Sequence, residues 1–392
     1  METKAGDPGA FAHFDLQRVD SPAFVVDAAK LRSNLQILAD IRDEADIKVL
    51  AALKAFSMWS AAPIIGEYLD GVSTSGLWEA RLASEFYDGE IATYSAAFKP
   101  EELEEICRLS DHVIFNSPFQ HDRARLILEH AAASGANVSV GLRINPQVPT
   151  GEVAKYDPSA PGSRLGFPLD QLTEEHMEGV EGIHFHNLCE QDFEPLKATW
   201  DRVFDVIEPF FGQLKWINMG GGHHITRADY QREELVEFLR DAAEDTGCQI
   251  ILEPGEAVAL DAGILVGTLL DTMFNEVPVG ITDISATCHM PDVLEAPYRP
   301  AMLGEIADDD MIPIRLGGPS CLAGDVIGDY RLPVPAEPGA RFAFLDQAHY
   351  SMVKTNTFNG VALPSIWMWD SETDALDCIK RFDYADFRDR LS

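Results

Sequence analysis

The chain has 392 residues, and 30 Lys and Arg against 65 Asp and Glu give it a formal net charge of −35 at pH 7. A carboxylate excess of this size argues against nucleic acid and membrane surfaces as partners, because their anionic groups attract clustered cations. Hydrophobic residues make up 46% of the chain, which excludes disorder, and at roughly 100–200 residues per domain the length predicts two or three domains. The acidity leaves three interpretations open: a self-repelling soluble surface, adaptation to salt, or attraction of a cationic substrate.

The six cysteines lie far apart in the sequence, so there is no Cys-x-x-Cys zinc or redox motif. Disulfide bonds are not expected in a chain of this size. The N-terminus METKAGDPGAFAHFDLQRVD has no apolar stretch typical of a signal peptide, and no run of about 18 apolar residues predicts a membrane helix. We expect a cytoplasmic globular enzyme or binding protein.

Eight short apolar runs alternate with segments of helical periodicity between residues 28 and 263. This repetition predicts an α/β fold, a closed (β/α)8 barrel of the TIM type. An open doubly wound sheet is the alternative, but it favours a glycine-rich turn after the first strand, and that run ends in a lysine. The predicted strands are Lys48–Lys54, Gly71–Ser75, Ile91–Ser95, His112–Asn116, Val138–Asn145, Glu181–His186, Lys215–Gly220 and Gln249–Gly255.

Residues 264–392 change in character, since strand-like runs recur there between prolines and glycines without long helices. This pattern predicts a mainly antiparallel β domain, which residues 1–27 join through the run Ala23–Val26. The other predicted strands are Ile264–Phe274, Val279–Ala286, Ile312–Leu316, Arg341–Leu345 and Val361–Met368.

Chemically reactive residues fall at the carboxyl ends of four predicted barrel strands, where barrel enzymes carry their active sites. Lys54 ends the first strand, His184 and His186 end the sixth, Gly220–Gly222 end the seventh, and Glu253 ends the eighth. A lysine in an apolar strand either reaches solvent with its amine or forms an imine after its pKa has been lowered.

The other strand-end features each have a functional and a structural interpretation. Glu253 could keep the ring nitrogen of pyridoxal 5′-phosphate (PLP) protonated, or form a structural salt bridge. Gly220–Gly222 could approach a phosphate, or form a tight turn. His184 and His186 face the same side of a strand, which fits a metal pair, a ring stacked on a flat cofactor, or buried hydrogen-bonded histidines. Further metal ligands at obvious spacings are lacking, His223 and His224 being weak candidates, so we expect no metal.

In the β domain, Cys321 lies in the turn-rich segment GGPSCLAGD, and Tyr350 lies in QAHYSM. A buried cysteine is usually inert, whereas a loop cysteine can be exposed and act as an acid. The Tyr350 hydroxyl could donate to a phosphate.

Seven motifs in order resemble the fold type III PLP-dependent decarboxylases of the alanine racemase fold, and most strongly the carboxynorspermidine/carboxyspermidine decarboxylase family. The likeness runs from about Pro22 to Gly360. The motifs are AALKAFS, GIHFHNLCE, NMGGGHH, EPGEA, TCHMPDVLEAPYRP, GPSCLAGD and QAHYSMVKTNTFNG.

This resemblance implies a role for each matching residue. Lys54 would bind PLP covalently as an imine, His186 would stack on its ring, and Glu253 would pair with its ring nitrogen. Cys321 would come from the other subunit of a homodimer and protonate the substrate carbon after CO2 leaves. The phosphate would be held by Gly220, Gly221, Gly222 and Tyr350, and Arg143 would lie near the cofactor face.

Differences from related families at two positions reduce the number of candidate substrates. Diaminopimelate decarboxylases have Arg at the position of Glu256 and Glu at the position of Leu322, and ornithine decarboxylases have Asp at the latter position. Both substrates are therefore poor candidates, and the resemblance implies decarboxylation of carboxynorspermidine or carboxyspermidine, which the sequence does not separate. Acidic residues would bind the cationic arm, and Arg299 would bind a carboxylate. The acidic candidates are Asp325, Asp292, Glu295 and Glu256.

Two other kinds of function stay open. One is another decarboxylase of the same fold, of diaminopimelate or ornithine type, or a racemase, which GPSC disfavours. The other is a non-catalytic PLP-binding or partner-binding relative, which would have no need of the acid Cys321.

Overall fold

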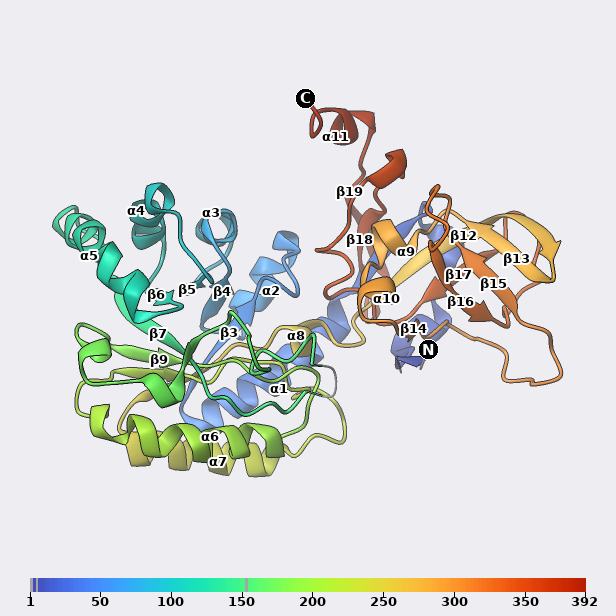
Figure 1. Ribbon diagram of the computed structural model, residues 1–392. Helices are drawn as coiled ribbons and strands as arrows, with labels where there is room; N and C mark the ends of the chain where they lie inside the picture. The colour runs from blue at the N-terminus through green and yellow to red at the C-terminus, as the bar shows by residue number, and fades with distance from the viewer. Residues whose placement is uncertain (1–2, 5, 152–153) are drawn as a thin grey trace. The chain divides into compact units, whose positions relative to one another are not determined.

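The computed structural model describes residues 3–4, 6–151 and 154–392, so residues 1, 2 and 5 of the predicted N-terminal segment lie outside it. By its internal contacts the chain forms two compact units (Figure 1). One, Ser33–Val258, is called the barrel unit below; the other, Met1–Arg32 with Ala259–Ser392, is called the sheet unit.

In the described part of the barrel unit, eight parallel strands close into a ring. Each strand pairs with the next along the chain, and the ring closes because the last strand, β11, pairs with the first, β3. The predicted closed barrel is confirmed, and the open doubly wound alternative is wrong. The strands are β3 (Lys48–Ala52), β4 (Gly71–Thr74), β5 (Glu90–Tyr94), β6 (His112–Phe115), β7 (Ser139–Asn145), β9 (Gly182–His184), β10 (Trp216–Asn218) and β11 (Gln249–Leu252), and the short β8 (Phe167–Pro168) pairs with the end of β7.

Helices pack outside this ring (Figure 1). They form where the sequence gives one apolar face and a start signal, as in α4, where Pro100 begins the helix, two glutamates follow in the first turn, and Leu103 and Ile106 are buried. The segment after β3 forms a 3-10 turn over Trp59–Ala61 that continues into a five-residue α-helix. The helices are α1 (Ala28–Ala45), α2 (Ala62–Gly66), α3 (Leu77–Phe86), α4 (Pro100–Leu109), α5 (Pro118–Ala133), α6 (Glu194–Ile207), α7 (Arg232–Thr246) and α8 (Glu256–Ala259).

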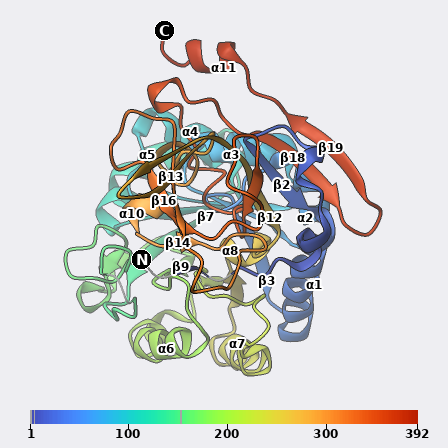
Figure 2. The ribbon, with the colours of Figure 1, turned by 90° about the vertical axis from the view of Figure 1, so that its right-hand side faces the viewer.

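The sheet unit is built around one mixed sheet with the order β16-β15-β13-β12-β2-β18-β19, and β17 also pairs with β12. The β13–β15 and β18–β2 pairs are parallel and the other pairs are antiparallel, so the predicted mainly antiparallel domain is confirmed. In Figure 2 the β18–β19 hairpin runs beside β2, which confirms that the N-terminal run joins this sheet. The strands are β2 (Ala23–Asp27), β12 (Gly263–Asn275), β13 (Val277–Thr282), β15 (Ile314–Gly317), β16 (Val326–Tyr330), β17 (Arg341–Phe344), β18 (Ser365–Asp370) and β19 (Ala375–Lys380).

Shorter elements complete the sheet unit. The strand predicted over 279–286 ends at Thr282, because the Ser285 side chain caps a new helical turn by accepting from the Cys288 amide. A buried cluster that includes Phe11, Phe14 and Trp369 forms the core on one side of the sheet. The shorter elements are α9 (Ala286–His289), α10 (Asp292–Glu295), α11 (Tyr384–Arg388) and the parallel pair β1 (Thr3–Lys4) and β14 (Arg299–Pro300). Among the described helices, none has the length and apolar composition needed to cross a bilayer.

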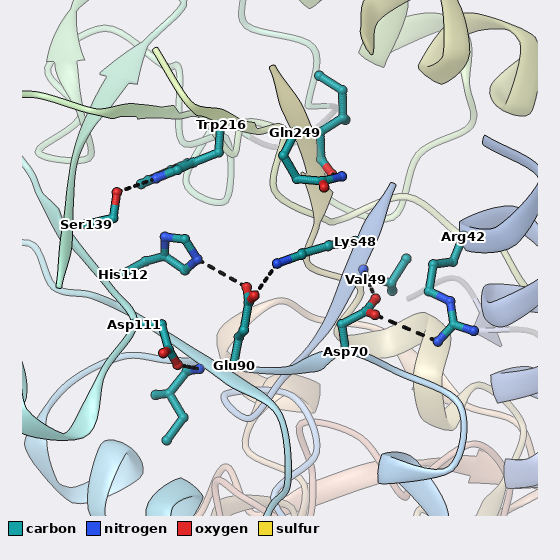
Figure 3. A network of polar contacts seen from close by, with 12 residues as sticks. Arg42, Lys48, Val49, Asp70, Glu90, Asp111, His112, Ser139, Trp216 and Gln249 are labelled. Atoms are coloured by element: carbon teal, nitrogen blue, oxygen red, sulfur yellow. Dashed lines mark hydrogen bonds and ion pairs between the residues drawn. The ribbon is translucent and has the colours of Figure 1, made fainter. Parts of the chain in front are cut away.

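Polar side chains tie the barrel strands together at their amino ends (Figure 3). Glu90, the first residue of β5, accepts from the Lys48 amine and lies 3.2 Å from His112 Nε2, and these partners begin β3 and β6. Beside them, the Trp216 ring packs edge-on against the His112 ring with centroids 4.9 Å apart, and Trp216 Nε1 donates to Ser139 Oγ at 2.8 Å. The hydrogen bond from His112 and the Lys48 ammonium outweigh the effect of burial and lower the pKa of Glu90 to about 2.

We expect Glu90→Gln to lower the free energy of unfolding at pH 7 by about 1.5–3 kcal/mol, the range for hydrogen bonds to charged groups. The folded-state pKa lies below the unfolded value of about 4.3, so this stabilisation is present above pH ~4.3 and is lost as the pH falls towards 2. Urea unfolding of both proteins at pH 7 and pH 3 measures the difference. Glu101→Gln, at an exposed position on α4, is the control, and an equal difference at both pH values would contradict the role given to Glu90.

Candidate active site

The barrel brings Lys54, His186 and Glu253 to the carboxyl ends of its strands. Lys54 lies two residues beyond β3, His186 two residues beyond β9, and Glu253 directly after β11. Lys54 Nζ is 2.9 Å from His186 Nε2. Residues separated by 132 and 199 positions of the chain therefore meet because the strands are parallel and the ring is closed.

The Lys54 amine has an unusual environment for a lysine. Solvent can reach its side chain, yet protein surrounds the amine closely enough to remove much of its hydration. This loss of hydration, with the nearby Arg143 guanidinium, lowers the pKa of Lys54 to about 8, although Glu253 acts in the opposite direction. About one amine in ten is then neutral and nucleophilic at pH 7, against fewer than about one in a thousand for an ordinary lysine.

His186 is held as a neutral ring beside this amine. Burial, then the charges of Lys54 and Arg143, lower its pKa well below the ordinary value for histidine. Its Nδ1 lies 3.0 Å from the Gly221 carbonyl oxygen, and Arg143 donates to the His186 carbonyl oxygen at 2.8 Å. When the Lys54 ammonium donates to Nε2, Nδ1 carries the ring hydrogen and donates to Gly221. These contacts fix the plane of the ring, and the Gly221 amide, 3.1 Å from Nδ1, would donate to that nitrogen in the other tautomer.

Glu253 is a buried carboxylate that stays ionised. Asn218 Nδ2 donates to its Oε1 at 2.7 Å, and its Oε2 lies 3.3 Å from His184 Nε2. Burial alone would raise the pKa of Glu253, but His184, Asn218 and Lys54 outweigh it and lower the pKa. In the described ranges 6–151 and 154–392, no group of three ligating side chains close enough to share a metal ion includes His184 or His186. These two histidines instead contact Glu253 and Lys54, so the metal-pair interpretation has no support from the geometry.

Arg143 lies on β7 with its side chain buried in the barrel. Its guanidinium lies over the Tyr94 ring, 4.4 Å from the centroid, and the Tyr94 hydroxyl donates to Asn116 Oδ1 at 2.7 Å. The aromatic face and the His186 carbonyl compensate for lost hydration and fix the position of the charge.

The three glycines after β10 are required by packing. Gly220 and Gly222 have φ of +71° and +90°, which side-chain-bearing residues rarely adopt. A Cβ atom on Gly221 would lie 2.0 Å from the Glu253 carbonyl oxygen, and one on Gly222 would lie 2.1 Å from that of Leu188. The backbones that follow β9, β10 and β11 therefore touch directly, a reason for glycine that does not depend on any ligand.

A second group of predicted residues gathers within the sheet unit. Asp325 is buried, and its carboxylate accepts from Ser285 Oγ at 2.8 Å, from Ser320 Oγ at 2.6 Å and from the Thr287 amide at 3.2 Å. Cys321, four residues earlier, is exposed. Asp325 thus holds the loop that carries Cys321.

Other predicted residues of the sheet unit have partners as well. Asp292 forms an ion pair with Lys354 at 2.7 Å, and the same ammonium lies 5.5 Å from the centroid of the Tyr350 ring. Tyr350 has φ of +49°, and Glu295 is exposed on α10. These positions leave Asp292 and Glu295 more accessible than Asp325.

Arg299 and Glu256 are both engaged by neighbours. The Arg299 guanidinium pairs with Glu305, donates to the Asp329 carbonyl oxygen at 3.0 Å and lies over the Tyr330 ring. Glu256 begins α8 in the barrel unit, with Oε1 at 3.5 Å from His224 Nε2.

Several residues that no sequence motif indicated hold the predicted ones in place. Asn218 ends β10, donates to Glu253 and accepts from the Gly220 amide at 2.9 Å. Tyr94 ends β5 and lies under Arg143. Their positions at the carboxyl ends of barrel strands could have indicated that both belong to the site. Asn359, whose Oδ1 accepts from the Cys321 amide, gave no such signal, because it lies in a turn of the sheet unit.

Similar proteins agree with this arrangement. Solved diaminopimelate decarboxylases share the fold at 18–19% identity, which shows the fold alone. No family model matches the chain. A closed parallel barrel and a sheet unit in one chain make the fold of the fold type III decarboxylases.

The chain is 37% identical over 383 residues to the carboxynorspermidine/carboxyspermidine decarboxylase of Campylobacter jejuni, which covers 95% of this chain and 98% of that protein. It belongs to the carboxynorspermidine/carboxyspermidine decarboxylase family. The solved carboxynorspermidine decarboxylase of C. jejuni, complexed with norspermidine, superposes with a TM-score of 0.86 at 37% identity, covering 95% of this chain and all of that one. Carboxyaminopropylagmatine decarboxylase of Synechocystis is also 37% identical, over 379 residues and 96% of each chain.

We expect the Lys54 amine to titrate near pH 8 in protein stripped of small-molecule ligands. Arg143→Gln should raise this pKa because a positive charge is removed, and Glu253→Gln should lower it because a negative charge is removed. The rate of reductive methylation of Lys54 against pH, measured by mass spectrometry, gives the pKa, and exposed lysines in the same digest serve as internal references. A shift of the same sign in both variants would contradict the electrostatic account.

Proposed function

We propose that this chain decarboxylates carboxynorspermidine or carboxyspermidine to norspermidine or spermidine with PLP bound at the carboxyl end of its barrel. The observation that carries the proposal is the Lys54–His186 pair beside an ionised Glu253, in a chain with 37% identity to the C. jejuni enzyme over nearly its full length.

The residues of the barrel fit PLP in three respects. The cofactor needs an amine that can form an imine, and Lys54 has a pKa lowered to about 8. It needs a flat group against its ring, and the neutral His186 is locked by Gly221. It needs an acceptor that keeps its ring nitrogen protonated, and Glu253 is buried and ionised. Bound PLP supplies an electron sink for the electron pair left when CO2 departs.

The residues of the chain have separate roles in the reaction. Lys54 would hold the cofactor through its amine. Glu253, oriented by Asn218, keeps a negative charge at the position of the ring nitrogen. Cys321 gives a proton to the substrate carbon that has lost CO2. Gly220, Gly221, Gly222 and Tyr350 would hold the cofactor phosphate, and Arg143 would lie near the cofactor face.

Carboxylates bind the cationic arm of the substrate. Asp292 and Glu295 are the more accessible candidates, whereas Glu256 is buried beside His224 and Asp325 already accepts three hydrogen bonds. Replacing the Lys354 ammonium at Asp292 by a substrate ammonium would preserve the ion pair. Arg299, bound within its own unit, is the candidate for a substrate carboxylate.

The Synechocystis relative supports a second candidate substrate, carboxyaminopropylagmatine, at the same 37% identity. The reaction at the α-carbon is the same, but this arm ends in a guanidinium. A planar guanidinium donates two parallel hydrogen bonds to a carboxylate, which a compact ammonium does not. The acidic residues of the arm site therefore decide between the two substrates.

CO2 release from a panel of substrates tests the function. We expect carboxynorspermidine and carboxyspermidine to give kcat/KM at least about tenfold above carboxyaminopropylagmatine and diaminopimelate, a difference of about 1.4 kcal/mol. Lys54→Ala should lose turnover and the absorbance band of the bound cofactor, while Lys215→Ala, at the opposite end of the barrel, should keep both. A borohydride-reducible imine in Lys54→Ala, or a reversed substrate ranking, would refute the proposal.

We also infer a homodimer with shared sites, since Lys54 and Cys321 belong to different units of the chain. Mixing inactive Lys54→Ala protomers with Cys321→Ala protomers, which keep only a small residual activity, should restore about a quarter of the wild-type activity, because half of the randomly formed dimers hold one intact site of two. Each variant mixed with itself is the control. If mass spectrometry demonstrates subunit exchange and activity still does not recover, each site comes from one chain.

A further inference from the structure

The loop that carries Cys321 is held at its tip by a single side chain from another segment. The Cys321 amide donates to Asn359 Oδ1 at 2.6 Å. The side chains around this point do not bury the tip, since Cys321 is exposed and the neighbouring Leu322 is 44% exposed. Within one chain, packing therefore contributes little to the position of Cys321, and the hydrogen bond from its backbone to Asn359 holds it.

Asn359 is itself held in an unusual conformation. It has φ of +60° and ψ of +15°, in the left-handed region that asparagine tolerates better than most residues. The turn is closed by the Gly360 amide, which donates to the Thr357 carbonyl oxygen at 3.2 Å. This backbone geometry aims the Asn359 side chain at the Cys321 loop.

The turn is anchored in the segment 285–288. Asn356 Nδ2 donates to the Thr287 carbonyl oxygen at 2.8 Å, and the Asn356 amide donates to the Cys288 carbonyl oxygen at 2.9 Å. Asn356 Oδ1 in turn accepts from the Phe358 amide at 2.9 Å. The segment that begins α9 thus fixes the turn that presents Asn359.

The same segment also fixes the far end of the Cys321 loop, through the bonds from Ser285 Oγ and the Thr287 amide to Asp325. These contacts form a closed circuit within the sheet unit. Segment 285–288 binds the Asp325 end of the loop, the loop leads to Cys321, Cys321 binds Asn359, and the turn of Asn359 is bound to segment 285–288. Asn359 is the member of the circuit that reaches Cys321 directly.

We propose that Asn359 is a positioning residue that sets the place of the Cys321 thiol for proton delivery to the substrate carbon. This inference rests on the proposed function for the role of Cys321. Asn359 acts through the Cys321 backbone, so its loss moves the thiol, while Asp325 keeps its own hydrogen bonds from Ser285 and Thr287 and the barrel residues of the cofactor site are untouched.

Two variants separate the hydrogen bond from the backbone geometry. Asn359→Gly keeps the left-handed conformation and removes the acceptor, whereas Asn359→Asp keeps both. We expect Asn359→Gly to lower kcat by up to about tenfold, the worth of one hydrogen bond, with KM and cofactor absorbance unchanged. Asn359→Asp should stay within about threefold of wild type. Equal losses in both variants, or wild-type kcat in Asn359→Gly, would overturn the proposal.

A double-mutant cycle tests whether Asn359 acts through Cys321. In a Cys321→Ala background with residual activity, Asn359→Gly should cost nothing further, and a further loss would overturn the proposal. The alkylation rate of Cys321 by iodoacetamide, read by mass spectrometry against the exposed Cys189, should change in Asn359→Gly and supplies a readout independent of turnover.

The same measurements distinguish the acid role of Cys321 from its positioning by Asn359. Wild-type turnover in Cys321→Ala would reject the acid role in the proposed function, and the alkylation rate would then decide the placement alone. An unchanged alkylation rate in Asn359→Gly would overturn the placement, whatever Cys321 does.

Discussion

The pairing of β11 with β3 is the constraint on which the barrel chemistry depends, because it closes the ring and brings the carboxyl ends of all its strands to one mouth. Lys54 and Glu253 follow these two neighbouring strands, and His186 reaches the Lys54 amine from β9. In an open sheet the first and last strands would be edges, and the amine and the carboxylate would lie far apart. The charged network of Glu90, Lys48 and His112 stabilises the same ring from the opposite end.

Desolvation inside this ring determines the protonation states. Lys54, Arg143 and Glu253 carry charge, while the histidines between them are kept neutral by burial and by the neighbouring cations. The neutral His186 can therefore contact the lysine without repelling it. The positive charge of Arg143 helps to lower the pKa of Lys54. Each charge has a partner: Asn218 on the glutamate, and the Tyr94 face and a carbonyl oxygen on the arginine.

Much of this arrangement was predictable, and the failures have identifiable causes. Strand ends in a parallel barrel share one face, so position alone indicated Lys54, His186 and Glu253. The strands β16 and β19 were missed because their exposed faces carry polar residues that dilute the apolar pattern. The burial of Asp325 could not be read from sequence, since its partners Ser285 and Thr287 are about 40 residues away and common surface types. The resemblance of the motifs indicated the family. No local sequence pattern indicates which acidic residues bind the cationic arm of the substrate.

The glycines after β10 have a mechanical consequence. Backbone meets backbone at Gly220, Gly221 and Gly222, with no side chain between the segments to absorb a displacement by changing rotamer. A shift of the segment after β9 must therefore pass directly to those after β10 and β11, and the ring of His186 and the carboxylate of Glu253 must move together. The barrel mouth behaves as one stiff rim, whose dimensions are set by peptide geometry and tolerate little adjustment to ligands of different thickness.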